Sequence, residues 1–483
     1  MPAQEVSVVG PLPGSLTATL DAIRHELAIP EAYPADAVAE AEASARSGGA
    51  RPPGAATDDE DRRDLPFVTI DPEGSRDLDQ AFHAERRAGG GFRIHYAIAD
   101  VAWFVAPGGA LDRETFARGV TLYQPDRRTS LHPDVLGQGA ASLLPDEDRR
   151  AVLWSIDLDA SGSPVGDPRF RRALVRSRRA MSYHEAQREL DDATAADPLV
   201  ILREVGLLRL ERERERGGIS LPLPAQEVVV DGGRPSLRFE APLPVEDWNA
   251  QISLLAGMVG AATMLDAGIG VLRTLPPPEP DALDDLRRRS GALGVEWPRS
   301  VRYADFVRSL DPDDTVGAVL LRRAARTLRG AGYEAFDGNP PALATHAAVA
   351  SPYAHVTAPL RRLVDRFANE VLLAVVAGRE PPEWARRALP DLPAAMGAAT
   401  QRERTLERTI LEGVEAVVLA PRVGEHFPAT VVAVDDRGRS STIQITDPAV
   451  VATVDQTEAV GAAVQVRLVA ADPVTRSVRF DVA

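Results

Sequence analysis

The order in which hydrophobic patterns follow one another restricts the fold of this chain more than any other feature. Residues 65 to about 393 begin with short β-type runs bounded by Gly, Pro and Asp, at 67–70, 92–99 and 152–157. The rest of this stretch has the apolar spacing of helices, at 199–216, 251–265, 282–293, 315–329 and 360–377. No repeat and no strict βαβ alternation is detectable, so the sequence predicts one large α+β domain.

The two ends of the chain have different patterns. Residues 15–47 have helical spacing, and residues 48–64 have the Gly, Pro and Asp content of a linker. A predicted helix at 397–417 leads into short strands at 427–434, 442–445, 450–454 and 464–469, with a turn at 435–438. Such strands are typical of a small barrel such as an OB-fold. The predicted units are therefore a helical segment and linker (1–64), the large domain (65–395), a connecting helix (396–420) and an all-β domain (421–483).

Composition excludes several kinds of chemistry. The 483 residues include no cysteine, so disulfides, thiolate metal sites and thiol nucleophiles are excluded, and any metal must be held by oxygen or imidazole. The net charge of −16 argues against a surface that is basic throughout, although a local cationic channel for nucleic acid is compatible with it. All 55 basic residues are arginine, which can contact phosphate in bidentate geometry.

The start of the chain carries no sign of secretion. The first basic residue is Arg24, so no positive n-region precedes an apolar core, and we expect a cytoplasmic protein. The longest apolar run, residues 252–265, is shorter than a bilayer requires and is followed by Asp266. This run predicts a buried core helix and no membrane role.

The most informative stretch begins at the end of the first predicted strand. The tetrapeptide Asp-Pro-Glu-Gly that starts at Asp71 fits a type I turn, which can bring Asp71 close to Asp77 and Asp79. In an extended chain Asp77 and Asp79 share one side, while Leu78 points away into the core. Three carboxylates about 4 Å apart repel one another by roughly 1 to 4 kcal/mol per pair, which favours a hard divalent cation such as magnesium. The spacing alone also fits an Asp-rich turn that makes caps and surface pairs, for example with Arg76.

A second polar block precedes the last predicted helix of the large domain. Thr357 can cap this helix, whose first turn contains Pro359, and a helix N-terminus attracts anions. From the residues alone, Arg361 and Asp365 also fit an i,i+4 surface pair worth about a few tenths of a kcal/mol. A set of arginines elsewhere fits either a track for a single-stranded backbone or a solvated strand face. These are Arg169, Arg171, Arg172, Arg176, Arg178 and Arg179.

Six blocks of sequence, taken in chain order, form a recognisable set. They are Asp71-x5-Asp77-x-Asp79 after a strand, Tyr96-Ala-Ile-Ala-Asp100-Val, Ala110-Leu-Asp-Arg-Glu, Arg118-Gly-Val-Thr-Leu-Tyr123-Gln-Pro125-Asp126-Arg127, Ala141-Ser-Leu-Leu-Pro145 and His355-Val-Thr-Ala-Pro359-Leu-Arg361-Arg362-Leu-Val-Asp365-Arg366. This set, over residues 65 to 380, resembles the catalytic domain of the RNase II/RNB family. The resemblance implies an α+β fold with a mixed sheet surrounded by helices, followed by an OB-fold resembling the family's S1 domain. The resemblance is to a short form of the family with an N-terminal helical segment.

The resemblance also implies a function. Members of this family are processive, sequence-independent 3′-to-5′ exoribonucleases that use magnesium, with manganese as an alternative, and water to release nucleoside 5′-monophosphates. Carried over, Asp71, Asp77 and Asp79 would hold the metal, and Asp79 and Arg361 would be catalytic, with Arg361 gripping the phosphate. The residues that would contact single-stranded RNA are Tyr123, His355, Arg361 and Arg362. A membrane or an obligate protein partner is not expected.

The sequence departs from the family pattern at two positions. Gln80 stands where the family usually has a fourth acidic residue, and a glutamine carbonyl can bind a cation but adds no charge and cannot act as a base. Leu363 stands where the family usually has a tyrosine. An alternative function is therefore a weak or inactive RNB-like protein that binds RNA. A two-carboxylate glycoside hydrolase is disfavoured, because the acids crowd one short segment and aromatic residues make up 5% of the chain.

Overall fold

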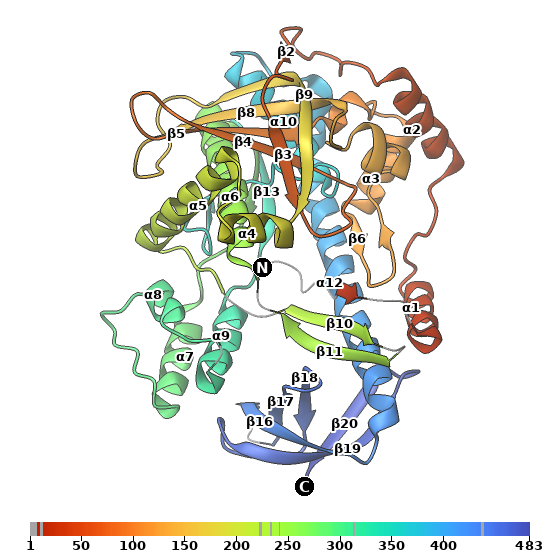
Figure 1. Ribbon diagram of the computed structural model, residues 1–483, viewed down its shortest axis with the longest axis vertical. Coiled ribbons are helices and arrows are strands. Elements are labelled where there is room, and N and C mark those ends of the chain that lie inside the picture. Colours follow the sequence, from red (N-terminus) through yellow and green to blue (C-terminus); the bar gives the residue numbers. More distant parts are fainter. Residues whose placement is uncertain are drawn as a thin grey trace.

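The strands of the first half of the chain close into a barrel, seen at the top of Figure 1. Its strands pair in the order β3 (Phe67–Asp71), β4 (Gln80–Arg86), β5 (Phe92–Ala99), β8 (Asp148–Leu158) and β9 (Arg169–Ser182). The long strand β9 closes the ring because it pairs with β8 antiparallel and with β3 parallel. A short strand, β2 (Glu60–Asp61), adds to β9 in parallel. The predicted α+β class and mixed sheet are confirmed, and the closure adds a feature that the sequence does not predict.

The computed structural model describes residues 7–9, 13–221, 225–231, 234–240, 242–312, 314–435 and 439–483. Residues 436–438 of the predicted turn at 435–438 lie outside this range. The domain bounds stay a prediction, whereas the bounds of the helices and strands follow from the structure.

Alternation of side chains along the barrel strands produces two separate cores. One face carries large side chains, including Phe82, Tyr96 and Trp154, that join the main core with the helices. These helices are α5 (Asp197–Arg216), α6 (Pro244–Ala267) and α10 (Leu363–Val376). The other face carries Ala81 with the larger Leu153 in a second core. Because helices cover the first face of the closed barrel, the second faces its interior, which side chains fill.

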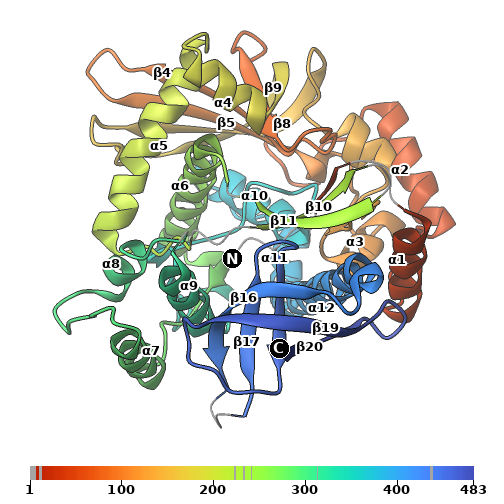
Figure 2. The same cartoon turned by 60° about the horizontal axis from the view of Figure 1, so that its bottom comes forward.

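The helical second half has the predicted elements, with shifted ends. Besides α5, α6 and α10 it contains α4 (Tyr183–Asp191), α7 (Pro280–Ala292), α8 (Tyr303–Arg308), α9 (Thr315–Thr327) and α11 (Glu383–Ala388). The helices α7, α8 and α9 share a small core of their own around Trp297 and stand to one side of the molecule (Figure 2). Strands that the sequence does not predict pair antiparallel nearby, namely β12 (Ile269–Thr274) with β13 (Gly332–Asp337) and β14 (Thr345–His346) with β15 (Ser351–Pro352).

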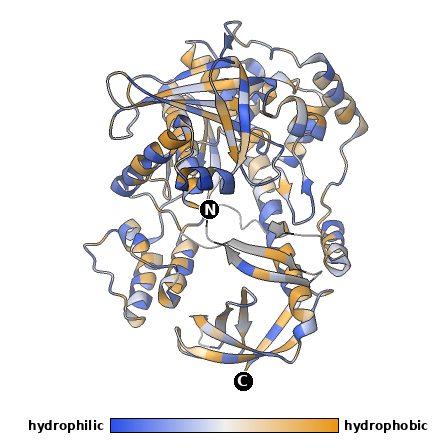
Figure 3. Ribbon diagram, in the orientation of Figure 1, coloured by the Kyte–Doolittle hydropathy of each residue, from blue (hydrophilic) through white to orange (hydrophobic). Residues whose placement is uncertain are grey.

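Helix α6 contains the longest apolar run. By length and composition it could cross a membrane, but half of its most apolar window is buried inside the protein. Ile252, Leu255 and Met264 are each at most 1% exposed and belong to the main core. In Figure 3, hydrophobic colouring runs through the barrel strands and the central helices, whereas α4, below the barrel strands, is mainly hydrophilic. The run therefore forms a core helix, as its length predicts.

A long helix links the large domain to the C-terminal strands. Helix α12 (Leu392–Leu419) leads to a sheet of order β18-β17-β16-β19-β20, seen at the bottom of Figure 1. These strands are β16 (His426–Val434), β17 (Ser441–Ile445), β18 (Val450–Val454), β19 (Ala463–Asp472) and β20 (Ser477–Val482). The predicted small all-β barrel is confirmed, with β18 and β20 in contact near its closure. Phe427 and Phe480 are each 1% exposed and contact each other edge to face, so both pack inside this barrel.

The N-terminal segment forms the predicted helices. These are α1 (Gly14–Glu26) and α2 (Ala35–Ser47), on the right of Figure 1. The strand β1 (Ser7–Val9) joins β10 (Ala225–Asp231) and β11 (Arg234–Glu240) in a separate small sheet. The remaining short elements include α3 (Ala110–Arg118), β6 (Leu122–Tyr123), β7 (Arg128–Thr129) and the helical turns Val101–Trp103, Leu136–Ala140, Leu389–Asp391 and Ala420–Arg422.

Acidic partners bind most of the arginines of β9. Arg171 pairs with Asp58, Arg176 with Asp148 and Arg179 with Glu189, each at the protein surface. Arg172 is different, because its side chain is 4% exposed and pairs with two buried acids, Asp100 at 2.7 Å and Glu370 on α10. This set is therefore neither a solvated face throughout nor a row of unpaired cations.

Removing the buried arginine should destabilise the protein far more than removing a surface one. Arg172→Ala leaves Asp100 and Glu370 buried without their cation, which should cost about 3 to 5 kcal/mol. Arg176→Ala on the same strand removes a side chain that is 37% exposed, and should cost less than about 1 kcal/mol. Urea unfolding of both variants and the wild-type protein measures the difference. Equal losses would show that the buried pairs do not hold α10 to the barrel.

Candidate active site

Asp71 lies at the end of β3, where the chain turns out of the barrel. The turn lies one residue later than predicted, because the Ser75 N–H donates to the Pro72 carbonyl at 3.2 Å. Gly74 is the third residue of this turn and has a φ of 78°. A positive φ at the third position belongs to a type II turn and requires glycine, so the predicted type I turn starting at Asp71 is wrong.

The carboxylate of Asp79 is buried and joins two distant parts of the chain. Asp79 is 1% exposed, accepts a hydrogen bond from the Leu360 backbone N–H at 2.7 Å and pairs with the Arg361 guanidinium at 2.9 Å. Burial raises the pKa of Asp79 to about 7, because these two donors offset only part of the cost of removing the charge from water. The structure thus places Arg361 in direct contact with Asp79.

Asp77 faces a different set of partners. It accepts hydrogen bonds from the Tyr123 hydroxyl at 2.8 Å and from the Arg128 guanidinium at 2.5 Å. Tyr123 and Arg128 lie directly opposite each other in the hairpin of β6 and β7. Between the two acids, Leu78 is 2% exposed and packs in the barrel-interior core, as predicted. The Tyr123 ring is therefore fixed by its hydroxyl beside the acids.

The charge of Asp77 acts on the pKa values of the other two acids. Burial raises the pKa of Asp71 to about 6, with a further contribution from the Asp77 charge, while the Arg361 charge acts in the opposite direction. The Asp77 charge also contributes to the raised pKa of Asp79. The three predicted acids and Arg361 thus share one electrostatic environment.

The acids do not form a preassembled metal cluster. Within the described residues, no group of three His, Asp or Glu side chains is arranged to hold an ion, because arginines already pair with Asp77 and Asp79. One observation nevertheless fits a hard cation. The Oδ2 atom of Asp71 is buried and has no hydrogen-bond partner among the residues described. A buried carboxylate oxygen without a donor is the kind of ligand that a divalent cation satisfies.

Gln80 is the first residue of β4 and follows Asp79 directly. Its carbonyl oxygen accepts only a long hydrogen bond, 3.4 Å, from the Tyr96 hydroxyl. The same hydroxyl lies 2.9 Å from the Ser253 hydroxyl of α6, which is the better partner. The Gln80 amide therefore adds a neutral oxygen beside the acids and no charge.

The polar block before α10 differs from its prediction. The helix begins at Leu363, not at residue 360, and Thr357 is buried in the preceding segment and does not cap it. Asp365 in the first turn accepts a hydrogen bond from the Ala358 N–H at 2.7 Å. Asp365 also binds Arg362 through both oxygens, at 2.7 and 3.0 Å, so the i,i+4 pair with Arg361 does not form. Arg361 is thereby left to contact Asp79.

His355 lies in an aromatic group beside Arg362. Its Nδ1 atom is 2.8 Å from the Tyr333 hydroxyl, and its ring contacts Tyr333 and Tyr353 edge to face. Burial, together with the charges of Arg362 and Arg273, lowers the pKa of His355 well below its usual value. The predicted RNA-contacting residues therefore fall into two groups, Tyr123 with Arg361 at the acids and His355 with Arg362 next to them.

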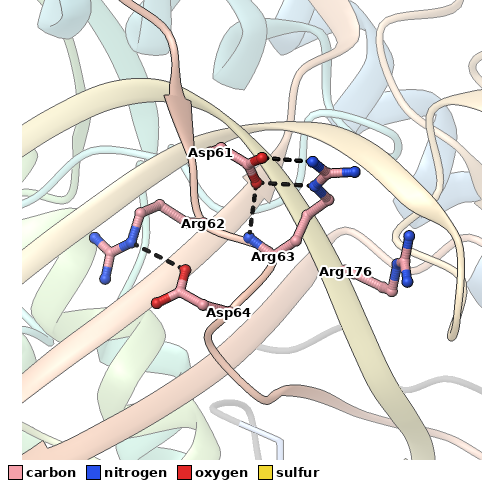
Figure 4. Close-up of a pocket in the computed structure, with 5 residues that line it drawn as sticks. All are labelled: Asp61, Arg62, Arg63, Asp64 and Arg176. Atoms are coloured by element: carbon pink, nitrogen blue, oxygen red, sulfur yellow. Dashed lines mark hydrogen bonds and ion pairs between the residues drawn. The ribbon is translucent and has the colours of Figure 1, made fainter.

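A surface pocket of about 600 Å³ lies where β3 begins, away from the acids (Figure 4). It is lined by Asp61, Arg62, Arg63, Asp64 and Arg176. Asp61 and Arg63 pair across it, Arg62 lies 3.6 Å from Asp64, and Arg176 pairs with Asp148 outside it. Each of its charged side chains already has an ion-pair partner, so the chemistry of the chain is better assigned to Asp71, Asp77 and Asp79 at the other end of β3.

Sequence comparison assigns the chain to a family that fits this geometry. The model of the RNB domain matches residues 59–378, and the model of the RNase II-type exonuclease C-terminal S1 domain matches residues 425–483. The chain therefore belongs to the RNB family, whose nucleases generally use a divalent metal. The resemblance found in the sequence is confirmed.

Individual relatives show how far the similarity extends. It is 30% identical over 334 residues to ribonuclease R of Escherichia coli (strain K12), covering 66% of this chain and 40% of that protein. Among solved structures, RNase R of Mycoplasma genitalium in complex with ribose-methylated single-stranded RNA covers 97% of this chain and 78% of that one, with a TM-score of 0.85 and 19% identity. Yeast Ssd1, described as a pseudonuclease, covers 82% of this chain and 50% of that one, with a TM-score of 0.67 and 16% identity. The chain spans between about a third and two fifths of the length of the first curated relatives it matches.

Two residues of the site escape sequence reasoning. Arg128 binds Asp77, but in the sequence it is one of several arginines near Tyr123. Burial raises the pKa of Glu403 of α12, and the charge of Arg362 acts to lower it, so Glu403 lies near the polar block. The cross-strand position opposite Tyr123 could have indicated Arg128, whereas no local signal marks Glu403.

The buried acids should make the metal-free protein less stable as the pH rises. The pKa of Asp71 is about 6 in the folded protein and 3.8 when exposed, so unfolding releases a proton between about pH 4 and 6. Stability is therefore lost as the pH rises through this range, and the penalty is fully present above it. At pH 7.5 with a chelator, Asp71→Asn should stabilise the protein by up to about 3 kcal/mol, since one pKa unit corresponds to about 1.4 kcal/mol. At pH 4 the gain should vanish.

Urea unfolding at the two pH values measures this effect. Asp61→Asn is the matched control, because Arg63 lowers the pKa of the exposed Asp61, so this change should not stabilise the protein at pH 7.5. A gain from Asp71→Asn that is equally large at pH 4 would attribute the effect to packing and not to the buried charge.

Proposed function

We propose that this protein is a 3′-to-5′ exoribonuclease that hydrolyses single-stranded RNA to nucleoside 5′-monophosphates, using magnesium or manganese. The observation that carries the proposal is the buried contact of Asp79 with Arg361, next to an unsatisfied oxygen of Asp71. A carboxylate group that prefers a cation beside a guanidinium suits cleavage of a phosphodiester, whose transition state gains negative charge. Membership of the RNB family supports the same reaction.

In this proposal, each residue has a separate task. Asp71, Asp77 and Asp79 would hold the divalent ion, which when bound supplies an activated water and neutralises phosphate charge. The Arg361 side chain is 42% exposed although its Nε atom is tied to Asp79, so the guanidinium can also reach a phosphate. Tyr123 presents a ring fixed at its hydroxyl, on which a terminal base can stack without regard to sequence.

The other proposed RNA contacts follow from the same arrangement. Arg362 is oriented by two hydrogen bonds to Asp365, and His355 is neutral because burial lowers its pKa. They suit a phosphate and a base or ribose, respectively. In the C-terminal barrel, Phe427 and Phe480 are packed inside, so stacking there would rest on other groups, such as the exposed His426. A cytoplasmic location and the absence of an obligate protein partner stay predictions.

A second candidate function is RNA binding with little or no hydrolysis. Gln80 favours it, because the family usually has an acid there and the neutral amide weakens the attraction of the site for a cation. Yeast Ssd1, a pseudonuclease, shares the fold. Both candidates use the same RNA contacts and differ only in the metal site.

A labelled RNA separates the two candidates. Single-stranded RNA carrying a 5′ label should be shortened from its 3′ end with release of mononucleotides when magnesium is present, and should stay intact with a chelator. Asp79→Asn should reduce the rate by at least about a hundredfold, because the charge paired with Arg361 and available to the ion is lost. Products on a denaturing gel are the measurement. RNA that stays intact with every variant and metal would support RNA binding without hydrolysis. Degradation by Asp79→Asn as fast as by the wild-type protein would refute the assignment of the catalytic residues.

Restoring the acid at position 80 tests the role of glutamine. Gln80→Asp should lower the magnesium concentration needed for half-maximal rate by about tenfold, because a fourth carboxylate strengthens the field at the ion. Gln80→Ala is the matched control and should not lower that concentration, since it adds no charge. The rate of RNA shortening measured over a magnesium titration decides this. An unchanged midpoint for Gln80→Asp would mean that this side chain lies outside the ion's coordination.

A further inference from the structure

The hairpin of β6 and β7 is held by the N-terminal helix α1, which lies outside the RNB match. Tyr123 and Arg128 of this hairpin both contact Asp77. The turn between the two strands contains Gln124 and Asp126, and α1 ends at Glu26, well before residue 59, where the match begins. A segment remote from the acids in sequence therefore contacts the part of the chain that orients one of them.

The contact is made by a buried arginine. Arg24 has a side chain that is 1% exposed and binds both oxygens of Asp126, at 2.8 and 3.0 Å. Arg24 also donates to the side-chain Oε1 atom of Gln124 at 3.1 Å. Asp21, one helical turn earlier, pairs with the Nη2 atom of Arg24. Gln124 in turn donates to the Thr129 hydroxyl at 3.2 Å across the hairpin. One guanidinium thus holds both the turn and its cross-strand contact.

A second contact holds the end of the hairpin. The Tyr33 hydroxyl, between α1 and α2, donates to the Ser130 carbonyl at 2.5 Å, directly after β7. The Arg118 guanidinium stacks over the Tyr33 ring at 3.8 Å and also donates to the Ser130 carbonyl at 3.2 Å. Asp21, Arg24 and Tyr33, here called the N-terminal clamp, therefore grip the hairpin at its turn and at its base.

The clamp itself is fixed to the body of the protein. Leu16, Leu20 and Ile23 of α1 are fully buried, and α1 packs against α12. The approach is close at Gly413, where a β-carbon would lie 2.9 Å from Thr19 and 3.1 Å from Ile23. Because α1 cannot move freely, its grip on the hairpin is a fixed reference and not a mobile contact.

A buried arginine gives this contact its strength. Burial acts to lower the pKa of Arg24, and the hydrogen bonds that Arg24 donates to Asp126 and Asp21 raise it. A displacement of the hairpin turn would leave the guanidinium without Asp126 in a buried position, which is costly. A helix that served only to cover apolar surface would need no such charge. The contact therefore restricts the hairpin and does more than add to the core.

We propose that the N-terminal clamp is a positioning device for the acids, with Arg24 its central positioning residue. By fixing the hairpin it holds Tyr123 and Arg128 on Asp77, and so keeps Asp77 directed toward Asp71 and Asp79. The consequence for metal and RNA rests on the proposed function, whereas the restriction of the hairpin does not.

Hydrogen exchange of the full-length protein tests the restriction directly. Arg24→Gln, Asp126→Asn and the double variant should each raise the exchange rate of residues 121–131 by about tenfold, with no further increase in the double variant, because both residues belong to one interaction. Helix α10 is the internal reference and should not change. Glu26→Gln is the matched control, because it breaks an ion pair of the same helix with Arg476 of the C-terminal barrel. The proposal would be overturned if the hairpin exchanged as slowly in Arg24→Gln and Asp126→Asn as in the control Glu26→Gln, whatever the activity of these variants.

Manganese binding and RNA shortening then separate this proposal from the proposed function. Arg24→Gln should weaken manganese binding and lower the rate at saturating RNA by about tenfold. RNA affinity measured with a chelator should also fall, because the released hairpin carries Tyr123. If the hairpin exchanges faster in the variant but the wild-type protein neither binds manganese nor shortens RNA, the clamp is supported and the proposed function is refuted. Faster exchange with full manganese affinity and rate in the variant would overturn the positioning role. Asp126→Asn, which leaves α1 intact, serves if Arg24→Gln does not fold.

Discussion

The burial of one carboxylate, that of Asp79, is the constraint on which the site depends. Its two hydrogen bonds join the loop after β3 to the segment before α10, residues that lie 281 and 282 positions apart in the chain. These donors do not fully offset burial, so the pKa of Asp79 rises to about 7 and that of Asp71 to about 6. A metal-free site of this kind is electrostatically unfavourable, which is common where function requires an added charge. The barrel and α10 are thus joined at a point that a cation would relieve.

Local sequence signals predict most of the regular elements, and they fail where a distant or unusual contact replaces a local rule. The strands 92–99 and 450–454 have the predicted bounds because their hydrophobic runs end at turn residues. The predicted start of α10 is wrong because Asp365 accepts a hydrogen bond from the Ala358 N–H. The chain therefore makes another turn before the helix begins at Leu363. The turn after β3 is misplaced because Gly74 can take a positive φ, which moves the turn by one residue.

The site divides in the same way. Asp71, Asp77, Asp79 and Arg361 could be found because they stand in blocks whose order and spacing resemble a family. Arg128 and Arg24 could not be found in this way. The role of Arg128 follows from the pairing register of two strands of two residues each, and that of Arg24 follows from the packing of α1 against α12. Closure of the barrel was missed for a related reason. The strand β9 pairs with β8 over its first half and with β3 over its second, which no hydrophobic pattern encodes.

The charges of the chain reconcile an acidic protein with an anionic substrate. A net charge of −16 argues against nucleic-acid binding only where binding depends on the summed charge of the whole surface. Here the arginines are divided among tasks, since Arg172 balances buried acids, Arg24 holds a hairpin and Arg176 pairs with Asp148. Arg361 remains 42% exposed beside the acids. The proposed contact with RNA therefore depends on where a few guanidinium groups are held, and the overall charge has little bearing on it.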